Sequence, residues 1–217
     1  MAAARPRLPL VFRALNRLMW LGLRLIGTRV VVEGAEHIPD APGVIVAFNH
    51  LSITDPPIVS ITLERLAGRR VRFMAKAEAF EQPVVGPLMA AYGGFPVRRG
   101  RADREAYRAA LEVLRAGEWL GLAPEGTRSR TGTLGEPKPG AVLLAMRAGA
   151  PVLPIGVAGT EQVWPVGRRL PRFGQRVTLR IGEPWLVERS ADAEAASEEL
   201  MRRIAALLPA HYRGRYG

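Results

Sequence analysis

Short apolar runs alternate with longer segments of helical periodicity along most of this chain. The runs VIVAF, at Val44–Phe48, and VLPIGV, at Val152–Val157, are apolar at nearly every position. Strands of this kind are covered on both faces, as in sheets that lie between two layers of helices. The alternation therefore predicts an α/β fold with a mixed, largely parallel sheet flanked by helices in a single domain.

The pattern gives residue ranges for these elements. The predicted strands are Arg29–Glu33, Val44–Phe48, Val71–Ala75, Trp119–Ala123, Val152–Val157 and Val177–Ile181. The predicted helices are Pro56–Leu66, Pro83–Tyr92, Ala102–Ala116, Gly140–Ala148 and Ala191–Leu208, and one more short strand is expected within Gly93–Gly100. In such sheets functional side chains collect just beyond the carboxyl ends of the strands, so polar residues there are the first candidates for a site.

The N-terminal segment has a pattern of its own, which predicts an amphipathic helix over residues 1–28 followed by a domain over residues 29–217. Leu8–Ile26 is strongly apolar, but arginines interrupt it, and its longest uncharged run is Leu18–Leu23. A membrane-spanning helix needs about 20 predominantly apolar residues. The interruptions also argue against a signal peptide.

The arginines of this segment, Arg13, Arg17 and Arg24, fall on one side of a helix, beside Asn16 and Trp20. A basic stripe on an otherwise apolar helix suits a helix that lies in a membrane interface. The alternative is a core helix with a solvated arginine face, and one helix can serve in both ways. The expected location is the cytoplasmic face of the cell membrane, as a peripheral or monotopic protein.

Composition narrows the possible functions. The chain has 217 residues, 31 basic and 20 acidic, for a net charge of +11. Such a surface attracts nucleic acid, anionic lipid or phosphorylated substrates. Aromatic residues make up only 6%, so few rings are available for stacking on bases, and no zinc-finger spacing is present. Nucleic acid is therefore not expected as a partner. The absence of cysteine excludes disulfides, thiolate zinc sites and cysteine nucleophiles.

The sequence FNHLSITDPP follows the apolar run GVIVA and places His50 and Asp55 in one turn. A carboxylate that orients one ring nitrogen of a histidine leaves the other free to remove a proton from a hydroxyl. Asp55 also has a structural explanation, because it precedes Pro56 at the expected start of a helix, where aspartate is a favoured cap. This spacing alone is a weak signal.

The sequence APEGTRSR, Ala123–Arg130, directly follows another apolar strand. Gly126 allows a sharp turn, and the guanidinium of Arg128 can hold a phosphate through two parallel hydrogen bonds. The alternative is an exposed charged turn without a ligand. Glu125 fits a hydroxyl group or an arginine partner better than the phosphate itself.

Two further basic loops are candidates for binding a phosphate. The sequence GGFPVRRG presents Arg98 and Arg99 after its short strand. The sequence PKPGA places Lys138 near a helix start, where free backbone N–H groups favour anions. Loops of this kind are often only solvated turns.

In combination these blocks are much more specific. NHLSITD, GGFPVRR, APEGTRS and APVLPIGV, in this order and spacing, resemble the glycerolipid acyltransferases. The similarity is greatest to the bacterial 1-acylglycerol-3-phosphate acyltransferases, also called lysophosphatidic acid acyltransferases, and it covers Val31–Glu183. Arg98 and Ala123 depart from the residues common in that family, which leaves the identity of the acceptor open.

The resemblance implies roles for the matching positions. It implies that His50 is the general base and Asp55 the carboxylate that orients it. It implies substrate binding by Arg99, Glu125, Gly126, Thr127 and Arg128, to which Arg98 and Lys138 are added for their charge, and a part for Pro154 in the acyl pocket.

The reaction that the resemblance implies moves a fatty acyl group from acyl-CoA or an acyl carrier protein to the sn-2 hydroxyl of 1-acylglycerol-3-phosphate, giving phosphatidic acid. Neither a metal nor another cofactor is expected. The absence of cysteine and of a G-x-S-x-G motif favours direct transfer, with Ser52 in a local hydrogen bond and not as a nucleophile. The alternatives are another lysolipid, acyl-amino acid or glycolipid acceptor, hydrolysis of the donor, and a basic membrane-binding module without catalysis.

Overall fold

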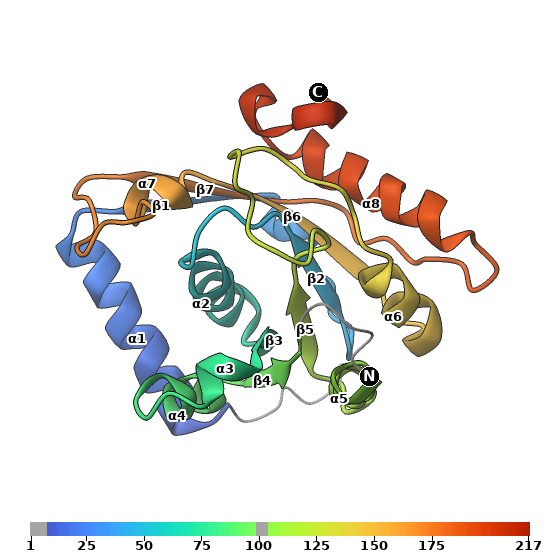
Figure 1. Cartoon of the computed structure of the whole chain (residues 1–217), viewed down its shortest axis with the longest axis horizontal. Coiled ribbons are helices and arrows are strands. Elements are labelled where there is room, and N and C mark those ends of the chain that lie inside the picture. Colours follow the sequence, from blue (N-terminus) through green and yellow to red (C-terminus); the bar gives the residue numbers. More distant parts are fainter. Residues whose placement is uncertain (1–7, 99–103) are drawn as a thin grey trace.

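The computed structural model describes residues 8–98 and 104–217 and places a seven-stranded sheet at the centre of the molecule. The strand order is β1-β7-β6-β2-β5-β3-β4, and every neighbouring pair is parallel except β6 and β7. The fold is thus the predicted α/β arrangement with a mixed, largely parallel sheet (Figure 1).

The elements have the following bounds. The strands are β1 (Arg29–Glu33), β2 (Ile45–Phe48), β3 (Val71–Lys76), β4 (Gly94–Val97), β5 (Trp119–Leu122), β6 (Val152–Ala158) and β7 (Arg176–Ile181). The α-helices are α1 (Leu10–Leu25), α2 (Asp55–Ala67), α3 (Ala77–Phe80), α4 (Val85–Tyr92), α5 (Arg104–Arg115), α6 (Gly140–Ala148), α7 (Thr160–Val163) and α8 (Ala193–Ala206). Three 3₁₀ turns complete the described elements: η1 (Ala35–His37), η2 (Ala210–Tyr212) and η3 (Gly214–Tyr216).

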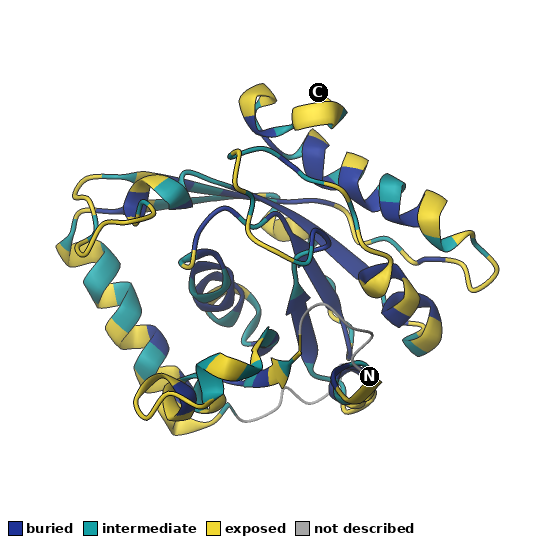
Figure 2. Cartoon of the chain, in the orientation of Figure 1, coloured by how far each residue is buried: buried dark blue, intermediate teal, exposed yellow. Residues whose placement is uncertain are grey.

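Helices cover both faces of the sheet. On one face α2 packs against alternate residues of the central strands, and α1 and α4 lie outside it. On the other face α5, α6 and α8 pack against the remaining residues of the same strands. Figure 2 shows the central strands buried, because each alternate side chain meets a helix on its own side.

The predicted elements are confirmed. Each predicted strand has its ends within one residue of the prediction, and each predicted helix of the domain within two, although the expected start of α5 at residue 102 lies outside the described residues. The helix expected from Ala191 begins at Ala193 because the Asp192 carboxylate caps it, accepting from the amide of Ala195 at 2.8 Å. The single-turn helices α3 and α7 were not predicted, since four residues show no periodicity.

Helix α1 packs on the domain and also exposes an apolar face. Its buried residues are Phe12 and Asn16, which face α2 and α4. Asn16 was expected beside the arginines, but its amide donates to Glu64 Oε2 at 2.7 Å and its carbonyl accepts from the Tyr92 hydroxyl at 2.6 Å. Burial is the main cause that raises the pKa of Tyr92, so the phenol stays a donor. This polar network fixes the rotation of α1 on the domain.

The opposite side of α1 faces outward. Its arginines are exposed, and so are large apolar side chains along a second stripe, at Leu10, Val11, Leu18, Leu21 and Leu25. Within residues 8–98 and 104–217, no helix is long and apolar enough to cross a bilayer. The division of the chain after residue 28 remains a prediction, because α1 is in direct contact with the domain.

Candidate active site

The turn between β2 and α2 brings His50 and Asp55 together. The Nδ1 atom of His50 donates to Asp55 Oδ2 at 2.8 Å. Asp55 is fully buried, whereas the His50 side chain keeps 18% of its surface exposed. Because Asp55 occupies Nδ1, Nε2 is the ring nitrogen that can accept a proton from a bound molecule. The pair predicted from the sequence is present with the geometry of a general base and its orienting carboxylate.

Asp55 does not cap α2, contrary to the structural explanation that its position before proline suggested. The helix begins at Asp55 itself and Thr54 is its N-cap residue. The carboxylate turns back instead, and Oδ2 also accepts from the amides of Leu51 and Ser52, each at 2.7 Å. One oxygen therefore holds both the ring of His50 and the backbone of the turn that carries it.

Glu125 has a positioning role that the sequence did not indicate. It is buried, and its two oxygens accept from two different loops: Oε1 from the amide of His50 at 3.2 Å and Oε2 from the amide of Gly135 at 3.0 Å. Burial raises the pKa of Glu125, and these two amides act in the opposite direction. With both oxygens bonded to backbone, Glu125 ties the loop after β5 to the turn of His50, and it is not among the residues that line the cavity described below.

A second bond joins the same two segments, because the amide of Ser129 donates to the carbonyl of His50 at 2.8 Å. Within this loop Gly126 has a φ of 70° and Lys138 lies over it, so that a Cβ at position 126 would be 2.8 Å from Lys138 Cδ. The positive φ favours glycine there, and a side chain at position 126 would also displace that of Lys138. The close packing places the Lys138 ammonium beside the turn.

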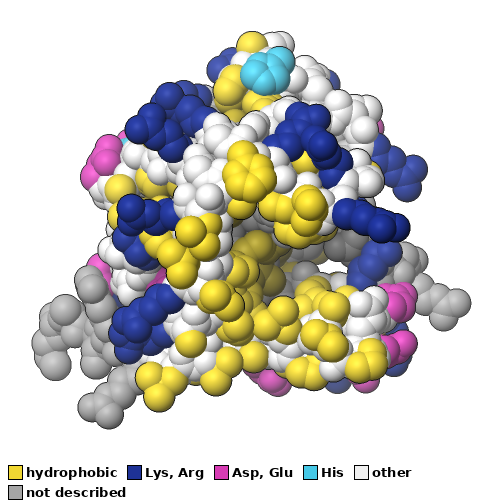
Figure 3. Space-filling model, turned by 90° about the vertical axis from the view of Figure 1, so that its left-hand side faces the viewer, with side chains coloured by type: hydrophobic (Ala, Val, Ile, Leu, Met, Phe, Trp, Pro, Cys, Tyr) yellow, Lys and Arg dark blue, Asp and Glu magenta, His cyan; other side chains and the backbone are white. Residues whose placement is uncertain are grey.

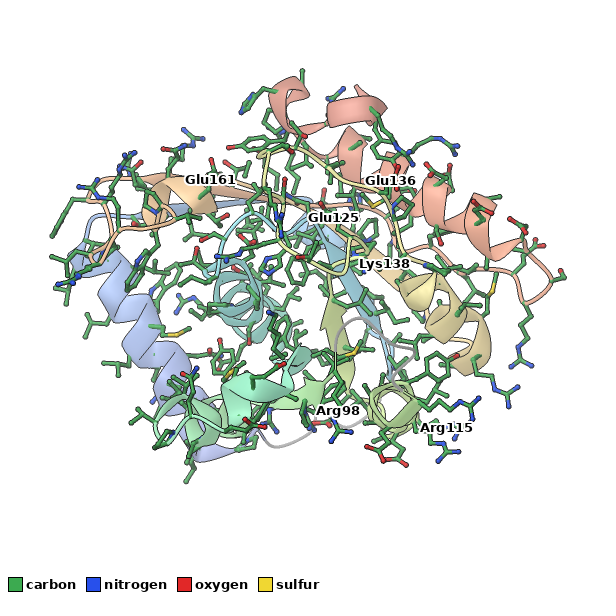
Figure 4. All side chains as sticks on the ribbon, viewed as in Figure 1. Arg98, Arg115, Glu125, Glu136, Lys138 and Glu161 are labelled. Carbon is green, nitrogen blue, oxygen red and sulfur yellow. The ribbon has the colours of Figure 1, made fainter. Side chains whose placement is uncertain are left out.

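These segments border a cavity of about 540 Å³ that opens beside His50. Its polar end is lined by His50, Thr127 and Lys138, and Arg98 is a further charged residue of the lining. Figure 4 shows Glu125 and Lys138 near each other, whereas Arg98 lies apart from them at the end of β4. The cavity thus has a general base and Lys138 at one end, and a second cation, Arg98, elsewhere in its lining.

The other end of the cavity is apolar, and nothing in the sequence identified it. Its lining residues come from two strands and two helices: Phe73, Met74, Leu122, Ala106, Tyr107, Ala141 and Leu144. They are ordinary core residues of β3, β5, α5 and α6, so only their arrangement in space distinguishes them. The small side chains of Ala106 and Ala141 leave the gap between the helices and the sheet.

Other predicted site residues do not reach this cavity. Arg128 is exposed and is not among the lining residues. Pro154 is buried in β6, where the amide of Gly182 donates to its carbonyl at 2.9 Å, and it lies two strands away from β5. The structure therefore does not bring either residue to the cavity, and Arg99 lies outside the described residues.

Ser52 has the local role expected of it. It is buried, and its hydroxyl accepts from the amide and the hydroxyl of Thr54, at 3.3 and 3.0 Å. A nucleophile would need an exposed oxygen in contact with a base. Ser52 therefore stabilises the turn, and the turn contains one group suited to proton transfer, His50.

Comparisons with known proteins agree with this geometry. The Acyltransferase family matches residues 29–158, which include β1 to β6 and the His50 turn. A chloroplastic 1-acyl-sn-glycerol-3-phosphate acyltransferase of Arabidopsis thaliana is 35% identical over 64% of this chain and 38% of its own. The 1-acyl-sn-glycerol-3-phosphate acyltransferase of Borreliella burgdorferi is 32% identical over 65% of this chain and 56% of its own.

A solved structure shares the fold. The crystal structure of the 1-acyl-sn-glycerophosphate acyltransferase PlsC from Thermotoga maritima superposes with a TM-score of 0.71 at 31% sequence identity, over 90% of this chain and 78% of that one. The chain spans about two fifths to just over half of the length of the two curated relatives described above. The match over β1 to β6, with the oriented histidine at its centre, shows that the chain belongs to the acyltransferase family.

Proposed function

We propose that this protein transfers a fatty acyl group from a thioester donor to the free sn-2 hydroxyl of 1-acylglycerol-3-phosphate, giving phosphatidic acid for phospholipid synthesis. The observation that carries the proposal is the oriented His50 at the mouth of a cavity whose lining includes two cations and a largely apolar interior. The names of the relatives at 31–35% identity support this acceptor.

The chemistry needs only groups that the chain supplies. Nε2 of His50 takes the proton of the acceptor hydroxyl as the oxygen attacks the thioester carbonyl. The new C–O bond forms, the C–S bond of the tetrahedral intermediate breaks, and the thiolate recovers the proton from the imidazolium. Asp55 holds the ring and stabilises its transient positive charge. No acyl-enzyme is required.

The two ends of the cavity fit two parts of the substrates. The acceptor phosphate is dianionic or nearly so; Lys138 supplies positive charge at the polar end, and Arg98 adds charge elsewhere in the lining. The apolar end fits a hydrocarbon chain, which gains about 0.8 kcal/mol for each buried methylene. Either acyl-CoA or an acyl carrier protein could present that chain, since both place a thioester at the end of a long flexible arm.

An acceptor panel with one labelled acyl donor tests the proposal. Purified protein is incubated with 1-acylglycerol-3-phosphate, a lysophospholipid that has a substituted phosphate, a glycolipid and an acyl-amino acid. We expect labelled phosphatidic acid to form fastest, with either acyl-CoA or an acyl carrier protein as donor. Preferred acylation of an acceptor without a phosphate monoester would overturn the assignment of the acceptor while leaving the reaction class in place.

Lys138→Ala is expected to raise the KM for 1-acylglycerol-3-phosphate by about tenfold to a hundredfold, with a much smaller effect on the KM for the donor. The reason is the loss of a charge-assisted hydrogen bond to a desolvated phosphate, worth about 1.5–3 kcal/mol. Arg128→Ala serves as the matched control, because Arg128 is exposed and outside the cavity lining. Steady-state kinetics on both variants measure the two KM values. A larger effect of Arg128→Ala would mean that the phosphate binds at the loop after β5, which carries Arg128.

Ala141→Leu is expected to reduce kcat/KM for long-chain donors at least tenfold and to leave short-chain donors almost unchanged. Ala141 is one of the small apolar residues of the cavity lining, so added methylenes occupy space that a long hydrocarbon chain would fill. Ala148→Leu, at the far end of α6 and outside the lining, is the control. The ratio of rates with long and short donors in each variant is the readout. An unchanged ratio in Ala141→Leu would show that the chain lies elsewhere.

We propose further that the protein works at a membrane surface, on the cytoplasmic face, as a peripheral or monotopic protein. Both substrates carry acyl chains, and α1 exposes a stripe of large apolar residues next to its arginines. Each arginine near an anionic surface contributes about 1 kcal/mol, within a Debye length. Apolar side chains in this position would enter the boundary between headgroups and acyl chains.

Replacing Leu18, Leu21 and Leu25 by Ser is expected to weaken binding to anionic vesicles more than it lowers activity on detergent-dispersed substrate. These side chains are exposed, so the fold does not depend on them. Deletion of residues 1–27 is a poorer experiment, because it also removes Phe12 and Asn16, which are buried against the domain. Vesicle sedimentation at low and high salt measures the effect. Undiminished binding of the triple variant would mean that α1 acts only as a core helix.

A further inference from the structure

A second exposed apolar segment lies outside α1, between α7 and β7. Its sequence is WPVGRRLPRF, residues 164–173. Val166, Leu170 and Phe173 expose 85%, 75% and 73% of their surfaces, and Trp164 is also exposed. A folded protein seldom leaves so many large apolar side chains in water within ten residues, unless they meet a partner.

The segment is held in a defined shape, as a binding element should be. The indole of Trp164 donates to the carbonyl of Arg168 at 2.9 Å, and the amide of Arg168 donates to Pro165 at 3.1 Å. The base of the loop is closed by the amide of Arg172, which donates to the carbonyl of Val163 at 2.8 Å. These bonds leave the apolar side chains pointing away from the core at little further entropic cost on binding.

The segment adjoins the C-terminal end of α1. The amide of Gly174 donates to the carbonyl of Ile26 at 2.8 Å, directly after the exposed Leu25. In Figure 1 the connection from α7 to β7 lies beside the upper end of α1. Figure 3 shows that the face toward α1 carries hydrophobic side chains interspersed with Lys and Arg. The two exposed apolar regions are therefore neighbours on one face.

Charge identifies the partner. Arg168, Arg169 and Arg172 are exposed between the apolar residues, and no acidic residue occurs from Gln162 to Gly182. A second copy of the chain would bring the same arginines against each other, which opposes self-association. An anionic bilayer matches both components, because the apolar tips enter the interface while the guanidinium groups stay with the headgroups.

We propose that residues 164–173 form a second membrane-contact element, which inserts Val166, Leu170 and Phe173 into an anionic bilayer beside α1. Two contacts on one rigid body restrict its rotation, whereas one helix alone would allow the domain to roll about the helix axis. The inference rests on the membrane association proposed above and adds a second, separately testable contact.

Site-specific labelling tests this directly, because the chain has no cysteine. Leu170→Cys, Leu25→Cys and Leu186→Cys each carry one environment-sensitive fluorophore. Leu186 is the matched control: it is a leucine with 63% exposure in the connection between β7 and α8. Each protein is mixed with phosphatidylcholine vesicles, with and without 30% phosphatidylglycerol, and with vesicles that contain a lipid-chain quencher. Phosphatidylglycerol supplies the anionic surface that attracts basic segments.

We expect blue-shifted emission and quenching at Leu170 and Leu25 with anionic vesicles, and no change at Leu186. A signal at Leu25 without one at Leu170 would overturn the second contact and leave the role of α1 intact. No signal at either site, in a protein that acylates dispersed acceptor, would overturn both membrane proposals but not the enzymatic one. A shift at Leu170 that depends on protein concentration without vesicles would identify a second copy as the partner and refute the proposal.

A pair of substitutions gives the energetic test. Leu170→Ser with Phe173→Ser is expected to raise the Kd for anionic vesicles at least tenfold, since withdrawing one large apolar side chain corresponds to about a factor of ten. Leu186→Ser is the control, and activity on detergent-dispersed substrate should be unchanged in both variants. Wild-type vesicle affinity in the double variant would contradict the proposal.

Discussion

His50→Ala is expected to lower kcat by about 10²–10⁴-fold, the usual contribution of a general base. The fold should survive, because the imidazole lies at a cavity mouth and its hydrogen bond is to Asp55. The backbone of residue 50 keeps its bonds to Glu125 and Ser129 whatever its side chain. The loss should therefore appear in turnover and leave the thermal unfolding temperature within a few degrees of wild type.

His211→Ala is the matched control, because His211 is exposed on η2 and distant in sequence from the turn. Initial rates at saturating donor and acceptor, together with a thermal unfolding curve, measure both effects. If folded His50→Ala protein turned over at a rate close to wild type, His50 could not be the general base.

Asp55→Ala should reduce activity by a similar factor and also destabilise the fold. Asp55 Oδ2 accepts three hydrogen bonds, and two of them come from the buried amides of Leu51 and Ser52. A buried donor that loses its acceptor costs about 1–3 kcal/mol. In a chain of this size that corresponds to a fall in Tm on the order of 5 °C.

Asp55→Asn separates orientation from charge. The asparagine carbonyl can occupy the place of Oδ2 and keep the three donors, and its amide nitrogen takes the place of Oδ1, which has no partner among the described residues. We expect a smaller loss of Tm than in Asp55→Ala and a smaller loss of kcat than in His50→Ala. Equal Tm values for the two Asp55 variants would show that the backbone bonds contribute little.

The sheet could be predicted closely because its central strands are buried on both faces. Runs such as Ile45–Phe48 and Val152–Ala158 are apolar throughout, so their limits are visible in the sequence. The two catalytic candidates could also be predicted, since a histidine and an aspartate at a strand exit are close in sequence and must be close in space. This pair was predictable because its two residues are close in the sequence.

Contacts between distant segments were not predictable in the same way. The bonds from Glu125 to the amides of His50 and Gly135 depend on how two loops meet above the sheet. The apolar end of the cavity depends on small residues of α5 and α6 facing the same space. Asn16 was expected on the basic side of α1, and only the packing of α1 on α2 and α4 showed that it is buried. Charge and hydropathy describe a residue but do not identify its partner.

The most direct test of the proposed mechanism measures the release of thiol from an acyl-CoA donor by wild-type protein, with and without 1-acylglycerol-3-phosphate. If His50 activates the acceptor hydroxyl for direct attack, thiol release requires the acceptor, and each thiol is matched by one molecule of phosphatidic acid. Thiol released at the same rate without acceptor, accompanied by free fatty acid, would identify a hydrolase. A stoichiometric burst without acceptor would identify an acyl-enzyme, and either result would contradict the proposed mechanism.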